Sequence, residues 1–324
     1  MRYRAALIGC GNIGSLYAND PKIQGIYTHA GAYIACPKTE LVSVCDIDEA
    51  KAKACAEQWK IDNYYTDIEK LLHEQQPQIV SICTVNKTHA DILSILLKTA
   101  GIKGIIVEKP LALDVKQAYQ LVQLAKEKEI PVIVNYNRRY AKGHQKIKQQ
   151  IENGEIGRIQ KISGYYTKGI LHNGTHWIDL ARWLVGEIES VQGFCTEQEI
   201  KSDPPIDAYF KFKNGASAFL QNLDADAYSV FEMDILGTEG RIRITYSGHR
   251  IEFFNVDESP YYDGYQILQK QHQFDDSVSN VILYVVEDLI SCIENGVVPR
   301  SSGDDGLAVL QIADALIQSA RVGK

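Results

Sequence analysis

The chain has 324 residues, of which 45% are hydrophobic and 23% charged, a mixture typical of globular proteins and long enough for about two domains. Its 34 basic and 41 acidic residues give a net charge of −7, which argues against nucleic-acid or acidic-membrane binding, because those partners attract basic patches. No apolar run approaches the ~18 residues of a membrane span. Seven scattered cysteines without a C-x-x-C pair favour reduced thiols in the cytoplasm over a disulfide framework or a zinc site.

The first 135 residues alternate short apolar runs with longer helical patterns. The runs are apolar throughout, as expected for parallel strands buried on both faces: Ala5–Ile8, Leu41–Cys45, Ile79–Cys83, Gly104–Val107 and Val132–Val134. The helical patterns between them are Asp48–Trp59, Asp67–Glu74, Thr88–Thr99 and Asp114–Glu129. This alternation of strands and helices predicts a doubly wound parallel sheet.

After about residue 155 the pattern changes to longer strands with partial alternation: Arg158–Thr167, Glu189–Ile200, Ala208–Leu223, Val230–Tyr246 and Arg250–Val256. Asn214-Gly215 is a strong hairpin signal, and the short turns favour a mostly antiparallel sheet. Helices are predicted at Thr175–Leu184, Ser277–Asn295 and Asp304–Ala320. We therefore expect an α/β fold with a dinucleotide-binding domain over residues 1–138 and an α+β domain with a large open sheet over 139–324, whose final helix, 304–321, can pack back on the first domain.

A glycine-rich turn follows the first predicted strand. Gly9-Cys10-Gly11-Asn12-Ile13-Gly14 matches G-x-G-x-x-G, in which glycines allow a tight turn and close approach of the backbone to a pyrophosphate. The position at the start of a βαβ pattern favours a Rossmann dinucleotide site contacted by Gly9, Gly11, Asn12 and Ile13. Cys10 within the turn is interpreted as a small packing residue.

Asp46 ends the second predicted strand. A carboxylate there accepts hydrogen bonds from the adenosine ribose and repels a 2′-phosphate, which favours NAD over NADP. The alternative is a cap for the following helix, for which Asp48 is an equal candidate. Asp46 lies 32 residues after Gly14, not the usual ~20, so we interpret 16–27 as an inserted loop beside the cofactor.

Glu108-Lys109-Pro110 follows the strand at Gly104–Val107, and, with the glycine turn and Asp46, resembles the Gfo/Idh/MocA family of oxidoreductases. Further motifs extend the resemblance over nearly the whole chain: Thr84-Val85-Asn86-Lys87-Thr88-His89, Arg138-Arg139-Tyr140, Asn153-Gly154-Glu155-Ile156-Gly157, Gly174-Thr175-His176-Trp177-Ile178-Asp179 and Arg300–Ala320. The resemblance implies hydride transfer between NAD(P) and a sugar or related hydroxyl compound. It also implies that Thr84, Asn86, His89 and Glu108 lie at the cofactor, and that Lys109–Pro110 is a cis peptide bond.

Oxidation of an alcohol by NAD needs a base for the hydroxyl proton, and the reverse reaction needs an acid. The resemblance places His176 and Lys109 at the catalytic centre; an imidazole titrates near neutral pH, and an ammonium stabilises a developing alkoxide. The alternatives are a helix-capping role for His176 and, for Lys109, a salt bridge to Glu108 or a solvated position in the loop. Asp179 lies one helical turn after His176 and either orients the imidazole or holds the helix.

His172 departs from the family, which often has an aspartate at this position. It binds substrate hydroxyls or an anionic group, shares in proton transfer, or is a passive loop residue. Asn173, Asp179, Arg138 and Tyr166 are the other expected substrate contacts. Although His172 and His176 are close in sequence, no third ligand is evident, so no metal site is predicted.

The main hypothesis is an NAD-dependent dehydrogenase of a sugar, nucleotide sugar or cyclitol. The alternatives are a keto-sugar reductase of deoxysugar or surface-polysaccharide synthesis, and a regulator of the same fold that binds NAD(P) without catalysis. Retention of both Lys109 and His176 argues against the regulator. We also expect the open sheet to be covered in a homodimer or homotetramer, since an uncovered apolar face favours association.

Overall fold

The computed structural model describes residues 2–195, 203–275 and 278–322. The chain forms two compact units: unit 1 comprises Met1–Tyr140 and Ser279–Leu310, and unit 2 comprises Ala141–Val278 and Gln311–Lys324. The observed division thus lies two residues after the expected one. Ser279–Leu310, which the sequence pattern places in the second domain, belongs to unit 1, and the last helix is shared between the units.

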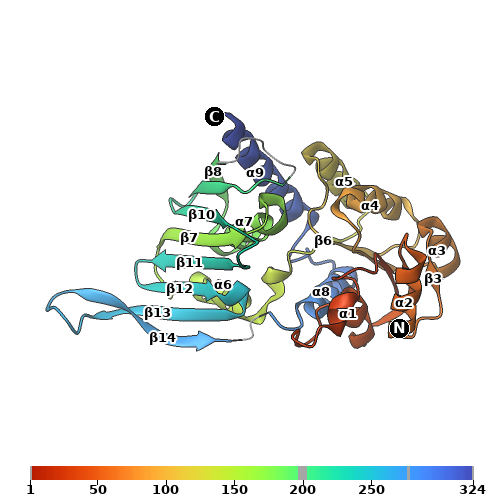
Figure 1. The fold of residues 1–324 in the computed structure, drawn as a ribbon, viewed down its shortest axis with the longest axis horizontal. Coiled ribbons are helices and arrows are strands. Elements are labelled where there is room, and N and C mark those ends of the chain that lie inside the picture. Colours follow the sequence, from red (N-terminus) through yellow and green to blue (C-terminus); the bar gives the residue numbers. More distant parts are fainter. Residues whose placement is uncertain (1, 196–202, 276–277, 323–324) are drawn as a thin grey trace. The chain divides into compact units, whose positions relative to one another are not determined.

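Unit 1 is built on a six-stranded parallel sheet in the order β3-β2-β1-β4-β5-β6 (Figure 1). The strands are β1 (Tyr3–Ile8), β2 (Thr39–Cys45), β3 (Tyr64–Tyr65), β4 (Ile79–Ile82), β5 (Gly104–Val107) and β6 (Val132–Val134). All five predicted strands are present, and their interiors are buried because helices cover both faces. The two-residue β3 was not predicted, since so short a segment carries no periodicity.

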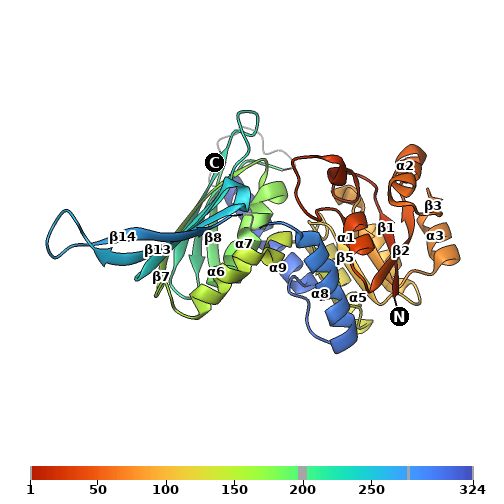
Figure 2. The same ribbon diagram turned by 90° about the horizontal axis from the view of Figure 1, so that it is seen from below.

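Three helices of unit 1 begin after an aspartate that caps them. The helices of the unit are α1 (His29–Ala35), α2 (Glu49–Trp59), α3 (Ile68–Gln75), α4 (His89–Lys98), α5 (Val115–Glu127) and α8 (Val281–Asn295). Carboxylates of Asp48, Asp67 and Asp114 accept hydrogen bonds from the first-turn amides of α2, α3 and α5. Helix α1 packs with α8 (Figure 2), and α4 packs with α5 (Figure 1).

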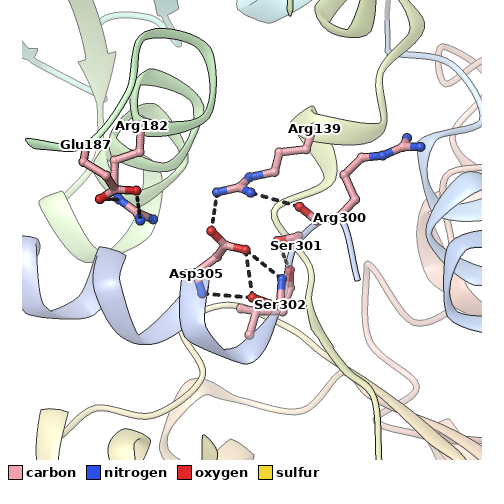
Figure 3. A network of polar contacts seen from close by, with 8 residues as sticks. Arg139, Arg182, Glu187, Arg300, Ser301, Ser302 and Asp305 are labelled. Carbon is pink, nitrogen blue, oxygen red and sulfur yellow. Dashed lines mark hydrogen bonds and ion pairs between the residues drawn. The ribbon is translucent and has the colours of Figure 1, made fainter. Parts of the chain in front are cut away.

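The segment before the last helix, α9 (Gly303–Val322), covers the edge of the parallel sheet. The Val134 amide donates to the Ser301 carbonyl at 3.0 Å, and the Ser301 hydroxyl donates to the Val134 carbonyl at 2.7 Å. Ser302 and Asp305 form a capping box: Asp305 accepts from the Ser302 amide at 3.0 Å, and the Asp305 amide donates to the Ser302 hydroxyl at 3.3 Å. Arg139 joins this network (Figure 3). Its guanidinium donates to the Asp305 carboxylate at 3.0 Å and to the Arg300 carbonyl oxygen at 2.9 Å.

Unit 2 contains an eight-stranded sheet in the order β14-β13-β12-β11-β7-β10-β9-β8 (Figure 1). The strands are β7 (Ile159–Thr167), β8 (Ile188–Phe194), β9 (Asp207–Phe212), β10 (Ser217–Leu223), β11 (Phe231–Gly237), β12 (Gly240–Thr245), β13 (Arg250–Glu258) and β14 (Gln266–Phe274). Every described pair is antiparallel except β7 with β10, which confirms the mostly antiparallel prediction. The predicted strand Glu189–Ile200 ends at Phe194, and residues 196–200 lie outside the described part of the chain.

Helices α6 (Lys142–Glu152) and α7 (Thr175–Val185) lie along one face of this sheet (Figure 2). Trp177 of α7 packs so closely on β7 that a Cβ at Gly164 would lie 2.0 Å from the indole Nε1. The opposite face carries exposed aromatic side chains, among them Tyr165 at 39% and Phe219 at 54% exposure. Within the described residues, no helix is long and apolar enough to cross a membrane.

Candidate functional site

The glycine turn after β1 combines two tight approaches with one open position. Gly9 has φ +99°, and a Cβ there would lie 2.5 Å from the carbonyl carbon and oxygen of Cys83. A Cβ at Gly14 would lie 2.2 Å from the Gly9 carbonyl oxygen. At Gly11 a Cβ would meet no atom within 4 Å. The outer two glycines therefore fold the turn, while Gly11 leaves its surface open for a ligand to approach the backbone.

Asp46 lies against this turn, and Asp48 caps the helix. One oxygen of the Asp46 carboxylate accepts from the Cys10 amide at 2.8 Å, and the other accepts from the Asp48 amide at 3.0 Å. The Asp48 carboxylate accepts from the amides of Ala50 and Lys51 in the first turn of α2. The capping role therefore belongs to Asp48, which leaves Asp46 as the carboxylate beside the glycines.

The inserted loop stays within unit 1. Leu16–Asn19 forms a 3₁₀ turn, and the chain then continues without regular structure until α1 begins at His29. Asn280, at the start of α8, accepts from the Ile26 amide at 2.8 Å through its side-chain oxygen. The contact agrees with the interpretation of 16–27 as a loop and shows what fixes its end.

The segment after β4 contains the predicted nicotinamide-side residues. Asn86 is exposed in the 3₁₀ turn Asn86–Thr88, and the Thr88 hydroxyl donates to that of Thr84 at 2.8 Å. His89 differs from its expected role: it is fully buried, with Nδ1 2.8 Å from the Pro110 carbonyl and Nε2 2.9 Å from the Thr84 carbonyl. Its polar atoms join two loops and are not presented to a cofactor.

Glu108 directly follows β5 and lies in a buried polar network. Its Oε1 is 3.1 Å from His29 Nε2 and accepts from Asn135 Nδ2 at 2.6 Å. Burial alone would raise the pKa of Glu108, but the hydrogen bond and charge of His29, the Asn135 amide and the charge of Lys109 together hold it below its ordinary value. Neither His29 nor Asn135 was predicted to be a site residue. Lys109 itself is half-buried, and the Lys109–Pro110 bond is cis, as expected.

Arg138 follows β6 in unit 1, close to the inserted loop. Burial is the main cause that lowers the pKa of its guanidinium to about 10. Burial likewise raises the pKa of Tyr27, with the charge of Arg138 acting in the opposite direction. Tyr27, at the end of the insert, therefore lies near the guanidinium expected to bind substrate.

The histidine segment of unit 2 forms a π-helical turn, Ile170–Gly174, followed by α7. His172 is exposed, His176 is half-buried, and Asp179 lies buried one turn later. The side-chain amide of Asn173 donates through Nδ2 to the Thr167 carbonyl at 3.0 Å. Tyr166 needs correction: it is fully buried, its hydroxyl donates to the Ile206 carbonyl at 2.8 Å, and it accepts from the Ile206 amide at 3.1 Å. The Tyr166 side chain is therefore part of the interior of unit 2, bonded to the Ile206 backbone, and is not available for substrate contact.

The residues of unit 1 fit NAD. The open position at Gly11 suits a pyrophosphate close to the backbone, and Asp46 offers a carboxylate to ribose hydroxyls at the carboxyl end of β2. A 2′-phosphate there would meet the same negative charge. In the described part of the chain, no three His, Cys, Asp or Glu side chains gather into a group that could hold a metal ion.

Comparison with known proteins identifies the family. The family model described as oxidoreductase family, NAD-binding Rossmann fold, matches residues 3–136, and that of the GFO/IDH/MocA C-terminal domain matches residues 144–243. Myo-inositol 2-dehydrogenase of Thermotoga maritima is 24% identical over 98% of this chain and 96% of its own length. The scyllo-inositol 2-dehydrogenase (NAD(+)) of Bacillus subtilis is 26% identical over 99% of this chain and 94% of its own length. The structure of levoglucosan dehydrogenase with NADH superposes with a TM-score of 0.82 at 21% identity, covering 99% of this chain and 98% of that one. The chain therefore belongs to the Gfo/Idh/MocA family of NAD-binding oxidoreductases.

Proposed function

We propose that this protein is a dehydrogenase that transfers a hydride between NAD and a secondary hydroxyl or ketone of a sugar, nucleotide sugar or cyclitol. The observation that carries the proposal is the glycine turn, which is open at Gly11 and has the Asp46 carboxylate docked against it. When bound, NAD supplies the hydride acceptor. The names of the relatives support the substrate class, since they act on inositols and levoglucosan.

His176 is the proposed general base in oxidation and general acid in reduction. It is half-buried at the start of α7, so its imidazole is held by the helix and remains accessible. Lys109 is the proposed cation that stabilises negative charge on the reacting oxygen. Arg138, His172, Asn173 and Asp179 are proposed to hold or orient the substrate and the histidine.

The test is turnover with a substrate panel. The purified protein is mixed with NAD and cyclitols, aldoses and nucleotide sugars, and with NADH and the corresponding ketones, while NADH absorbance is recorded. His176→Ala and Lys109→Ala should each lower kcat by roughly 10²–10⁴, the range for loss of an acid–base group or of charge stabilisation. The NAD affinity of His176→Ala should stay within about twofold of the wild-type value, because the proposed role of His176 is to exchange a proton with the substrate and not to bind NAD. Full activity in both variants, or NAD binding without turnover of any substrate, would refute the proposal and favour a regulator.

The exposed sheet of unit 2 is the proposed subunit interface of a homodimer or homotetramer. Tyr165, Phe194 and Phe219 are 39%, 50% and 54% exposed, and Tyr209 lies 5.0 Å from Phe219 between ring centroids. Aromatic side chains are enriched in such interfaces. Light scattering at micromolar concentration should give an oligomer that Phe219→Glu dissociates; a monomeric wild-type protein would contradict the assignment. The seven free cysteines support a cytoplasmic location, where thiols stay reduced.

A further inference from the structure

Two fully buried histidines contact the residues on either side of Lys109. His29, the first residue of α1, lies 3.1 Å from the carboxylate of Glu108 through Nε2. His89, the first residue of α4, lies 2.8 Å from the carbonyl oxygen of Pro110 through Nδ1. The residue before the proposed catalytic lysine and the residue after it are thus each held by an imidazole.

On the Glu108 side, the hydrogen bonds form a chain through the interior. Tyr33 OH is 2.6 Å from Ser81 Oγ, and Ser81 Oγ is 2.9 Å from His29 Nδ1. An ionised carboxylate only accepts, so His29 Nε2 must carry the hydrogen that points at Glu108. On the other side of the ring, Ser81 contacts Nδ1, and Tyr33 in turn contacts Ser81. This arrangement satisfies a carboxylate that has left bulk water.

The fixed carboxylate acts on its neighbour in sequence. The positive charge of Lys109 is one of the causes that lower the pKa of Glu108, so the two charges lie close enough to stabilise each other. Asn135, which is 1% exposed, holds the same Glu108 oxygen from the end of β6. Glu108 is therefore held from helix α1 by His29 and from the residue after β6 by Asn135, and Lys109, the next residue in the chain, follows this fixed point.

On the Pro110 side, His89 joins two loops that leave neighbouring strands. Its other nitrogen, Nε2, lies 2.9 Å from the carbonyl oxygen of Thr84, which follows β4. The ring thereby connects the loop after β4 with the loop after β5, both at the carboxyl edge of the parallel sheet. In this sheet type, that edge is where ligands bind.

We propose that His29 and His89 are positioning residues that fix Lys109 between them, His29 through the Glu108 carboxylate and His89 through the Pro110 carbonyl. The inference rests on the proposed role of Lys109 in catalysis. A displacement of order 1 Å in a catalytic group can cost about 10²-fold in rate, so loss of either contact should lower kcat by roughly 10–10². Substrate KM and NAD affinity should change much less, because neither histidine is exposed.

The decisive variants separate the two nitrogens of His29. In His29→Gln, the amide reaches about as far as Nε2 and can still donate to Glu108; in His29→Asn, it reaches only the Nδ1 position. Positioning predicts that kcat is largely retained in His29→Gln and falls roughly 10–10² in His29→Asn. His144→Gln, at a fully buried histidine of unit 2, is the control for general loss of a buried imidazole, and its kcat should stay within about twofold.

A second measurement reports on Lys109 without turnover. Competitive labelling of amino groups with acetic anhydride, read by mass spectrometry of the Lys109 peptide, gives the reactivity of that amine in the NAD-free protein. We expect His29→Asn and His89→Leu to raise the Lys109 labelling rate several-fold, with other lysines unchanged. Unchanged labelling and unchanged kcat in both variants, alongside an inactive Lys109→Ala, would overturn the inference and leave the proposed function intact. An active Lys109→Ala would instead refute the role of Lys109 itself.

Discussion

The glycine turn allows folding and cofactor binding to be separated with one matched pair of substitutions, Gly11→Ala and Gly14→Ala. Each adds a single methyl group to the same turn. At Gly14 the new Cβ would lie 2.2 Å from the Gly9 carbonyl oxygen, more than 1 Å inside the 3.4 Å at which ordinary contact begins. At Gly11 it would meet no protein atom within 4 Å, and the backbone there is not in the left-handed region.

The two variants should change stability in opposite directions. Relief of the Gly14 clash requires a shift of backbone, and overpacking of this kind costs roughly 1–3 kcal/mol. Gly11→Ala restricts the unfolded chain at a compatible position and should stabilise by about 0.4–1 kcal/mol. For a unit of this size, each kcal/mol corresponds to about 2–4 °C in Tm. Thermal melting without NAD should therefore show a clear decrease for Gly14→Ala and a small increase for Gly11→Ala.

The affinity of the variants for NAD should not follow their stability. The methyl group of Gly11→Ala occupies the space in which we expect the pyrophosphate to approach the backbone, so binding should weaken at least tenfold, which is about 1.4 kcal/mol. Calorimetric titration with NAD measures this in a protein that melts no lower than wild type. Wild-type affinity in Gly11→Ala would refute the assignment of this turn to the cofactor. A wild-type Tm in Gly14→Ala would refute the steric argument.

Three further predictions use carboxylates of unit 1. Asp46→Ala should weaken NAD binding by roughly 10–10² and raise the ratio of NADP to NAD affinity, measured by titration with both, because a charged acceptor is lost and a repulsion removed. Asp305→Ala should lower the free energy of unfolding, measured with denaturant, by more than Ser302→Ala does, since it removes a carboxylate that lies 3.0 Å from the 5%-exposed Arg139 guanidinium as well as its part in the capping box; Ser302→Ala removes a cap hydroxyl and should cost about 0.5–2 kcal/mol. The pKa of Glu108 is lower in the folded chain than its ordinary 4.5, so its ionised form stabilises above about pH 4.5 and this contribution is lost as pH falls further. The Tm difference between wild type and Glu108→Gln should accordingly be largest near neutral pH and shrink in acid; a difference that grows in acid would contradict the sign.

The strands of unit 1 could be predicted because their burial on both faces makes them continuously apolar. The same reasoning fails for β14, whose sequence Gln266–Phe274 is largely polar because it is the exposed edge of its sheet. Helix α6 was missed for a related reason: Gly143, His144 and Ile147 are its buried residues, and its remaining residues are mostly polar. Periodicity reports burial, so elements with little apolar burial leave a weak signal.

Backbone geometry was predictable where a motif fixes it, as in the glycine turn Gly9–Gly14 and in the cis bond between Lys109 and Pro110. The environment of each side chain was not. Tyr166 and His89 belong to segments near the site, yet both are buried and their polar atoms contact backbone groups. Position along the chain places a residue near a strand end, but the direction of its side chain depends on packing partners distant in sequence.

The network around Glu108 shows which information the linear sequence lacks. Its members follow or belong to four different strands: His29 comes after β1, Ser81 lies in β4, Glu108 follows β5, and Asn135 follows β6. These strands are consecutive neighbours only because the sheet has the order β1-β4-β5-β6. The geometry at Lys109 therefore depends on the register of these four strands, including β6. Ser301 bonds to the outer edge of β6, and the next residue, Ser302, is linked through Asp305 to Arg139. A change in that closing segment should consequently reach the site through Asn135, which couples the stability of the sheet edge to the placement of the proposed catalytic lysine.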